Sequence, residues 1–284
     1  MLDKRTLIID FHTHLLPLSF DARRAEIAAK DQTFAALFGD PNARLATTPE
    51  LLTAMDEDGV DLTVALGYGW CDEGVAREAN DYLLEAASGS NGRIVAFCSV
   101  HPGWGDAALR EVERCAAAGA VGIGELHPTS QGIKLGSDSK LAALMELAVE
   151  KGLPVVVHGS EPVGHAYAGK GDTFPGELLA MAQRFPDAQI VGAHWGGGLP
   201  FYAHMPEVRE ALANVWFDSA ATPFLYDRGV FSTVASAVGA ERMLFGSDFP
   251  LVRPKRVAEL AIEEMRPAQA ARFLGGSAKE LLSL

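Results

Sequence analysis

Short apolar runs alternate with longer stretches of helical periodicity along most of the chain. Eight runs rich in β-branched and other apolar residues have the length and composition of buried strands. The runs are Leu7–His12, Leu62–Leu66, Ile94–Val100, Val121–Leu126, Pro154–His158, Ile190–His194, Val215–Asp218 and Met243–Asp248. Strands that are apolar throughout are expected where both faces of a sheet are covered. The pattern therefore predicts an α/β protein with a parallel sheet.

Helical segments fill the intervals between these runs. The periodicity predicts helices at Pro49–Asp58, Ala107–Ala118, Leu141–Lys151, Gly176–Phe185 and Pro206–Ala213. Several of them are followed by a glycine, which is typical of a helix C-terminus. Eight strand–helix units are the number found in a (β/α)8 or TIM barrel. We therefore expect residues 1–284 to form a single TIM-barrel domain.

Two segments fall outside the strand–helix repeat. The interval Leu15–Pro49 contains a predicted helix around Arg24–Phe38 and is interpreted as an insertion after the first strand that covers the barrel mouth. The last residues, Pro267–Leu284, are expected to form a short helical extension that packs on the outside of the barrel.

Charge and composition exclude several classes of protein. The 284 residues carry 24 Lys+Arg against 37 Asp+Glu, a formal net charge of −13, without a basic cluster. Binding to nucleic acid or to a membrane surface is therefore not expected. No signal-peptide region follows Met1, and no apolar stretch has membrane-spanning length. The three cysteines form no CxxC pair, which favours a reducing, cytoplasmic location.

Polar residues at the ends of the predicted strands carry the candidate chemistry, because barrel enzymes place their active sites there. These residues are His12, His14, Glu125, His158, His194 and Asp248. Any one of them alone would more often be an ordinary polar residue than a ligand. His12 and His14 are two residues apart, so they point to the same side of a strand. Imidazole and carboxylate groups favour zinc, with manganese, iron or cobalt as alternatives, so we predict a site for one or two divalent ions.

Five motifs of the chain resemble those of the amidohydrolase superfamily, and more narrowly its amidohydrolase 2 group of metal-dependent hydrolases and decarboxylases. The motifs are IDFHTH at 9–14, GIGELHP at 122–128, VH at 157–158, AHWGG at 193–197 and GSDFP at 246–250. The resemblance extends from Ile9 to about Leu284.

The resemblance implies a role for each residue of the predicted metal site. His12, His14 and His158 would coordinate metal, and Asp248 would be both a ligand and the proton acceptor. His194 would bind a second metal or polarise a carbonyl group. Many relatives carry a carboxylated lysine where this chain has Glu125, so Glu125 either bridges two metals or orients a ligand histidine. His127, on the same strand face, is the most plausible substitute ligand.

Candidate substrate-binding residues lie mainly in the loop after the fifth predicted strand. His165, Tyr167 and Lys170 offer hydrogen-bond donors to a polar or anionic substrate, and Arg253 does so from the segment after Asp248. Trp195 is a candidate apolar wall. The alternatives are that Lys170 and Arg253 are solvated surface charges, that Glu161 pairs with Lys170, and that Trp195 belongs to the core.

Three functions remain open from the sequence. The first is a metal-dependent hydrolase, in which metal-activated water attacks an amide, lactone or ester-like bond and Asp248 takes the proton. The second is a nonoxidative decarboxylase of an aromatic or unsaturated carboxylic acid. The third is a noncatalytic metal- or ligand-binding barrel. Two metals would favour hydrolysis and one metal would favour decarboxylation. In every case the expected partner is a small molecule, with a homodimer as the default assembly.

Overall fold

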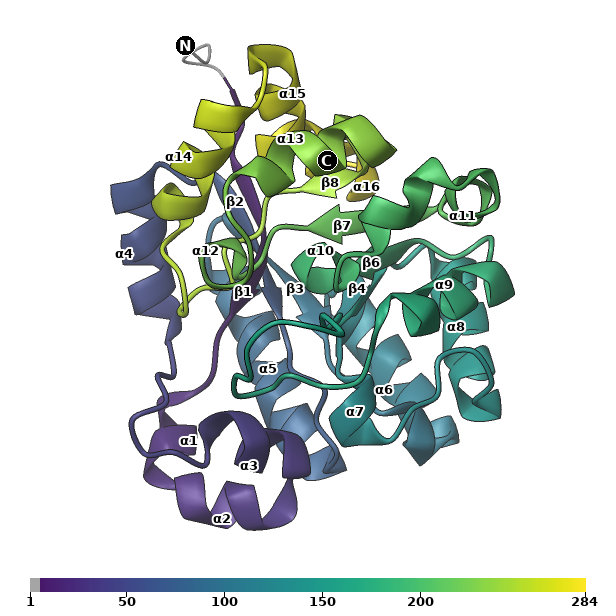
Figure 1. Cartoon of the computed structure of the whole chain (residues 1–284). Coiled ribbons are helices and arrows are strands. Elements are labelled where there is room, and N and C mark those ends of the chain that lie inside the picture. The colour runs from purple at the N-terminus through teal and green to yellow at the C-terminus, as the bar shows by residue number, and fades with distance from the viewer. Residues whose placement is uncertain (1–5) are drawn as a thin grey trace.

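Eight parallel strands follow one another around a barrel in the computed structural model, which describes residues 6–284. Residues 1–5, on which the expectation of no signal-peptide region partly rests, lie outside the described residues. The strands are β1 (Ile9–His14), β2 (Leu62–Leu66), β3 (Ile94–Cys98), β4 (Gly122–Leu126), β5 (Val155–Val157), β6 (Ile190–Gly192), β7 (Val215–Asp218) and β8 (Met243–Leu244). The Phe11 amide donates to Phe245 O (2.6 Å), and the Asp248 amide donates to His12 O (2.8 Å). These bonds join β1 to the segment after β8, so the predicted (β/α)8 barrel is confirmed (Figure 1).

The strand ends differ from the prediction where two site residues lie. We expected the sixth and eighth strands to continue to His194 and Asp248, but β6 ends at Gly192 and β8 ends at Leu244. His194 has φ 54° and Asp248 has φ 67°. This left-handed backbone conformation cannot continue a strand. Both side chains are therefore presented from tight turns rather than from strand ends.

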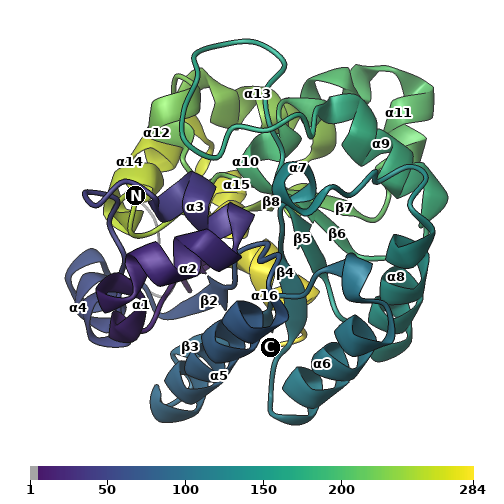
Figure 2. The same ribbon diagram turned by 90° about the horizontal axis from the view of Figure 1, so that it is seen from below.

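Helices surround the barrel and connect its strands (Figures 1 and 2). The longer ones are α4 (Thr48–Asp58), α5 (Glu73–Gly89), α6 (Asp106–Ala117), α8 (Ser139–Lys151), α9 (Pro175–Arg184), α13 (Gly229–Val238) and α14 (Pro254–Glu264). The shorter helical segments are α7 (Pro128–Gln131), α10 (Ala193–Gly196), α11 (Pro206–Ala211), α12 (Thr222–Leu225), α15 (Pro267–Ala271), η1 (Pro102–Trp104), η2 (Leu199–His204), η3 (Ala240–Arg242) and η4 (Arg272–Gly276). None of the helices within residues 6–284 is both long and apolar enough to span a membrane.

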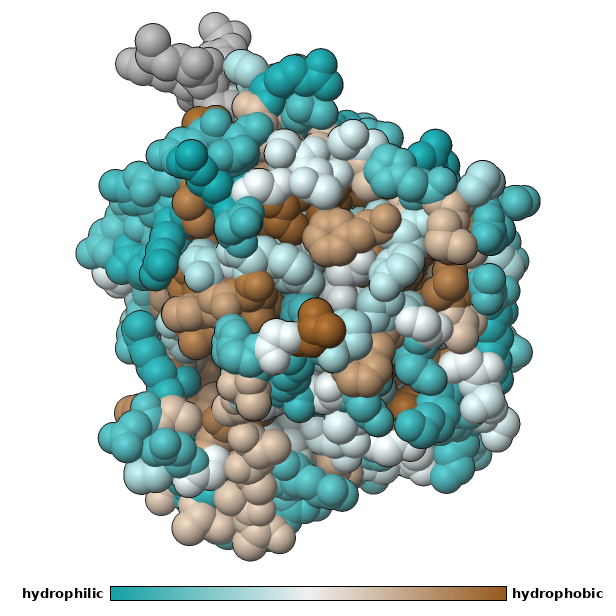
Figure 3. Space-filling model, viewed as in Figure 1, coloured by the Kyte–Doolittle hydropathy of each residue, from teal (hydrophilic) through white to brown (hydrophobic). Residues whose placement is uncertain are grey.

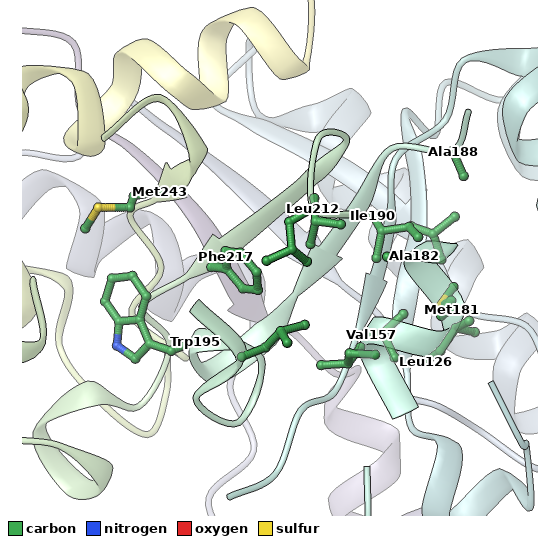
Figure 4. Packing of buried hydrophobic residues seen from close by; sticks show 14 of the residues in the cluster. Leu126, Val157, Met181, Ala182, Ala188, Ile190, Trp195, Leu212, Phe217 and Met243 are labelled. Carbon is green, nitrogen blue, oxygen red and sulfur yellow. The ribbon is translucent and has the colours of Figure 1, made fainter. Parts of the chain in front are cut away.

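The layer between strands and helices is a continuous apolar core. Outward-facing strand residues such as Val157, Ile190 and Phe217 belong to the same buried cluster as Met181 of α9 and Leu212, which follows α11 (Figure 4). Burial of this surface is the main source of stability for the fold. It also fixes the strands whose C-terminal ends carry the site.

A second apolar cluster fills the inside of the barrel. Phe11, Phe97 and Leu244 belong to it, together with Ala278 and Leu281 of α16 (Ser277–Leu281). The prediction that the C-terminal extension packs on the outside is therefore wrong for α16. Its apolar residues close the barrel interior at the end away from the site. Figure 2 looks at the barrel from the end that carries the site, so α16 is seen behind the strands.

The insertion after β1 consists of three short helices, α1 (Leu18–Ala22), α2 (Arg24–Lys30) and α3 (Gln32–Phe38). The single helix predicted around Arg24–Phe38 is interrupted at Asp31, whose backbone is extended (φ −124°, ψ 116°). The Asp31 carboxylate accepts hydrogen bonds from the amides of Phe34 (2.8 Å), Cys71 (2.6 Å) and Asp72 (2.8 Å). It therefore caps α3 and fastens the insertion to the loop after β2.

Candidate functional site

The side chains predicted as metal ligands converge at the C-terminal end of the barrel. The Nε2 atoms of His12 and His14 are 3.0 Å apart. The nearest Glu125 oxygen lies 3.9 Å from His12 Nε2 and 3.8 Å from His14 Nε2. The nearest Asp248 oxygen lies 3.8 Å and 3.5 Å from the same two nitrogens. Two imidazoles from β1 and two carboxylates from different segments therefore face a common point.

Two overlapping groups of donor atoms have the spacing of a metal site. One group is His12, Glu125 and His194, and the other is His12, His14 and Asp248; within each, all donor atoms lie within 4.8 Å of one another. Ligands bound about 2.0–2.2 Å from one ion are separated by comparable distances. His12 is common to both groups. The arrangement can therefore hold one cation or two neighbouring cations.

His158 adds a free imidazole nitrogen to this cluster. Its Nδ1 lies 3.0 Å from a Glu125 oxygen. An ionised carboxylate only accepts hydrogen bonds, so the proton belongs on Nδ1, and Nε2 carries an unprotonated lone pair. Nε2 is buried and has no hydrogen-bond partner. A buried nitrogen without a partner is costly unless it binds something, so this atom fits a cation-binding role.

Asp218 at the end of β7 belongs to the same cluster, and the sequence analysis did not single it out. Its side chain is fully buried, and one oxygen lies 2.8 Å from His12 Nδ1. The other oxygen accepts hydrogen bonds from the amides of His194 (3.0 Å) and Ala220 (3.0 Å). A carboxylate on the far nitrogen of a ligand histidine fixes the orientation of the ring and raises its basicity. The available signal was that the seventh apolar run ends in Asp218, at the same rim as the other ligands.

The buried charges perturb one another strongly. Burial opposes protonation of His12, but the Asp218 carboxylate outweighs it and raises the pKa of His12 to about 9. In the same way, Glu125 and Asp248 overcome burial and raise the pKa of His194 to about 10. Burial and the neighbouring His12 lower the pKa of His14 to about 4. Without a cation, the cluster therefore holds protons on His12 and His194, and a cation must displace them.

A cavity of about 440 Å³ opens above the cluster. The apolar residues in its wall are Leu37, Phe38, Ala43, Ala168, Ala221, Phe224, Leu225, Pro250 and Leu251. Tyr68 also lines it, stacked on the ring of His14 with a centroid distance of 4.0 Å. Among the described residues, Arg44 is the one lysine or arginine in the wall. The walls suit an apolar ring, and the floor offers the polar groups.

The exposed apolar side chains of this region come from loops and from helix α12. Val163, Phe224 and Leu251 are 73%, 49% and 59% exposed. Figure 3 shows apolar surface gathered in the middle of one face, within a more polar surround. The insertion contributes Leu37 and Phe38 to one side of the cavity wall.

The loop between β5 and α9 brings two of its three predicted substrate-binding residues to the cavity. His165 and Tyr167 line it, and the Tyr167 hydroxyl donates to Glu161 Oε2 (3.0 Å). Lys170 instead donates to the carbonyls of Val163 (2.7 Å) and His165 (3.0 Å). The prediction for Lys170 is therefore corrected, because its amine braces the loop from within. The partner of Glu161 is Tyr167 and not Lys170.

The structure also places Trp195 and Arg253 away from the cavity. Trp195 is fully buried beside Phe231, and its indole N–H donates to Thr222 Oγ1 (2.9 Å). It belongs to the core under the helices, because the left-handed turn at His194 and Trp195 sends the two side chains to different sides. Arg253 pairs at the surface with acidic residues of α4, at 2.8 Å from Glu57 and 2.7 Å from Asp58. Neither residue lines the cavity, and Arg44 of the insertion does so instead.

Comparison with known proteins gives a family and a set of similar folds. A family model described as amidohydrolase matches residues 9–284. No curated protein matches the chain. One similar structure is a 5-carboxyvanillate decarboxylase from Sphingomonas paucimobilis, with 18% identity, a TM-score of 0.79, and coverage of 98% of this chain and 99% of that one.

Two further similar structures come from other bacteria. One is a dihydroxybenzoic acid decarboxylase from a Polaromonas species with bound manganese and the inhibitor 2-nitroresorcinol (18% identity, TM-score 0.75, 98% and 97% of the two chains). The other is a 2,6-dihydroxybenzoate decarboxylase from Rhizobium (16% identity, TM-score 0.73, 98% and 99% of the two chains). At these identities the likeness establishes the fold alone.

Proposed function

We propose that this chain, which belongs to the amidohydrolase family, is a metal-dependent nonoxidative decarboxylase of a small aromatic carboxylic acid. The observation that carries this proposal is the position of the ligand cluster at the floor of an apolar cavity lined by Phe38, Tyr68 and Phe224. The decarboxylases of the same fold add support. The hydrolase expected first from the sequence is therefore the second candidate, and the decarboxylase alternative is preferred.

The residues that would hold the cation are His12, His14, Glu125, His158 and Asp248, with His194 beside them. Manganese is bound in the similar Polaromonas structure, so it joins zinc, the sequence-based choice, as a candidate ion. A bound divalent cation supplies a Lewis acid that holds the substrate's oxygen atoms and stabilises negative charge on them.

Asp248 is the group we assign to proton transfer. Loss of carbon dioxide breaks the bond between the ring and the carboxyl carbon, leaves the electron pair on the ring carbon, and requires one proton there. The Asp248 side chain lines the cavity and is 16% exposed, against 0–4% for His12, His14 and Glu125. Asp248 is therefore the carboxyl group best placed to deliver a proton to the vacated carbon. Tyr68 and Phe38 pack against the ring.

The proposal is tested by following ring-hydroxylated benzoates with the manganese-loaded protein in D₂O. The expected result is carbon dioxide release together with one deuterium on the vacated ring carbon, detected by NMR. A chelator-treated sample is the control. Cleavage of lactones or amides by the same preparation, without carbon dioxide release from any acid, would contradict the proposal.

One observation favours the hydrolase as the second candidate. The two groups of possible metal ligands share His12, and Glu125 faces both His12 and His194. This arrangement suits two cations. The number of metal ions per chain separates the two functions, because two ions with a requirement for Glu125 would favour hydrolysis. The homodimer and the cytoplasmic location remain predictions.

A further inference from the structure

His127 lies at the junction between the ligand cluster and the loop that covers the cavity. It directly follows β4, and its ring is stacked on that of His158, with centroids 4.3 Å apart and an interplanar angle of 18°. Its edge reaches the backbone of the loop between β5 and α9, where Nε2 lies 3.1 Å from Gly169 O. One side chain therefore contacts both a candidate metal ligand and the cover of the cavity.

The hydrogen bonds of His127 fix the orientation of its ring. A carbonyl oxygen only accepts, so Nε2 carries the proton and donates it to Gly169 O. Nδ1 is then the acceptor, and the Ser130 hydroxyl lies 2.8 Å from it. The His127 amide donates to Gln131 Oε1 (3.0 Å), and the Gln131 side chain donates to Trp70 O (3.1 Å) and Val100 O (3.0 Å). The residue is thus held by two neighbouring loops as well as by its own turn.

The covering loop is attached at few points. Residues 162–166 are exposed. Thr129 and Asp172 exchange two hydrogen bonds (2.7 and 2.9 Å) near its end. Gly169, at φ 86°, packs so closely against Leu37 of the insertion that a Cβ there would lie 2.6 Å from Leu37 Cδ2. The bond from His127 is therefore made where the loop meets the insertion and the cavity closes.

We propose that His127 is a positioning residue that links closure of the loop between β5 and α9 to the orientation of His158. The face of the His127 ring keeps the His158 imidazole in the orientation in which its Nδ1 contacts Glu125. The Nε2–H of His127 holds the loop over the cavity. The inference rests on the proposed role of His158 as a metal ligand, and it does not depend on which reaction the enzyme catalyses.

Two substitutions separate the two halves of this role. His127→Phe retains a flat ring against His158 but removes the hydrogen bond to Gly169 O. His127→Gln retains an amide donor near the position of Nε2 but removes the stacked ring. Lys170 is the only lysine or arginine between Lys151 and Arg184, so cleavage by trypsin after Lys170 reports opening of the loop. Manganese affinity, measured by calorimetry on the full-length chain, reports the His158 side.

The variants are expected to behave differently. In His127→Phe, cleavage after Lys170 becomes about two- to tenfold faster, since the loss of one hydrogen bond shifts the opening equilibrium by that factor. Its manganese affinity stays close to that of the original protein. In His127→Gln, cleavage is unchanged and manganese affinity falls about 10–100-fold, the usual effect of losing support for a ligand.

The opposite results would overturn the inference. Unchanged cleavage of His127→Phe would show that His127 does not hold the loop, and unchanged manganese affinity of His127→Gln would show that it does not orient His158. Loss of both properties in both variants, with a lowered melting temperature, would assign His127 a merely structural role. Neither readout involves turnover, so this failure is distinct from a failure of the decarboxylation assay.

Discussion

At the scale of single residues, a carboxylate or a backbone carbonyl fixes the orientation of each candidate ligand imidazole by contacting one of its ring nitrogens. Asp218 holds His12, Glu125 holds His158, and the Ala220 carbonyl lies 3.1 Å from His194 Nδ1. These contacts determine which nitrogen is free to bind a cation. We assign proton transfer to Asp248, the most exposed of the cluster's carboxylates.

Replacing Asp248 by Asn is expected to separate catalysis from metal binding. The amide retains an oxygen near the cation but has no acidic proton to deliver, so turnover should fall by about 10²–10⁴-fold. Metal content, measured by elemental analysis, should remain substantial. Turnover close to that of the original protein would show that another group transfers the proton.

Replacing Asp218 by Asn is expected to weaken the site indirectly. Asp218 uses one oxygen for the His12 ring and the other for two backbone amides. The Asn side chain has only one acceptor oxygen, so it cannot accept from both sides at once. The orientation of His12 is therefore lost. Metal affinity should fall about 10–100-fold, as measured by competition with a chelating dye. Equal affinities of the variant and the original protein would exclude this orienting role.

The convergence of the candidate ligands was predictable from the sequence because parallel strands of one barrel end at the same rim. His12, His14 and Glu125 therefore had to meet once the strands were identified. The left-handed turn at His194 and Trp195 was not predictable, since nothing in the local sequence shows that one side chain enters the site and the next enters the core. The pairing of Arg253 with α4 likewise depends on tertiary contacts.

At the scale of elements, α16 contributes to stability from the end of the barrel opposite the site. Leu281 is 6% exposed and belongs to the same cluster as Phe11 and Leu244. A C-terminal helix of this length is predictable from its periodicity. Its docking against the barrel interior was missed, because apolar spacing shows which face is buried and not which partner covers it.

Truncating Leu281 to Ala is therefore expected to lower the free energy of unfolding by about 2–5 kcal/mol, the usual cost of a buried Leu→Ala change. Leu284→Ala is the matched control, since Leu284 is 51% exposed. Urea denaturation measures both. Equal midpoints for the two variants would show that α16 does not close the barrel.

At the scale of the whole molecule, metal binding and protonation compete. The pKa values of His12 and His194 are raised to about 9 and about 10 in the metal-free site. The protonated histidines stabilise the metal-free fold, and this contribution is complete at pH values below their ordinary pKa near 6.5. It is lost as the pH rises through about 9–10. A cation must displace the same protons, so its affinity changes in the opposite direction.

Manganese affinity is therefore expected to rise as pH increases from about 6.5 to 9, by roughly tenfold per pH unit for each proton displaced. Calorimetry in buffers of different ionisation enthalpy should show proton release on binding at pH 7.5. Binding without proton release would mean that His12 and His194 are already neutral in the metal-free protein.

The most direct test of the account is the metal content of the chain. Protein stripped with a chelator, reloaded with manganese or zinc and freed of excess ion should retain about one ion per chain if it is a decarboxylase of the proposed kind. A variant combining His12→Ala and His14→Ala, treated identically, should lose it. Retention of the same amount by this variant, or no retained ion in the original protein, would contradict the metal centre on which the proposed function depends.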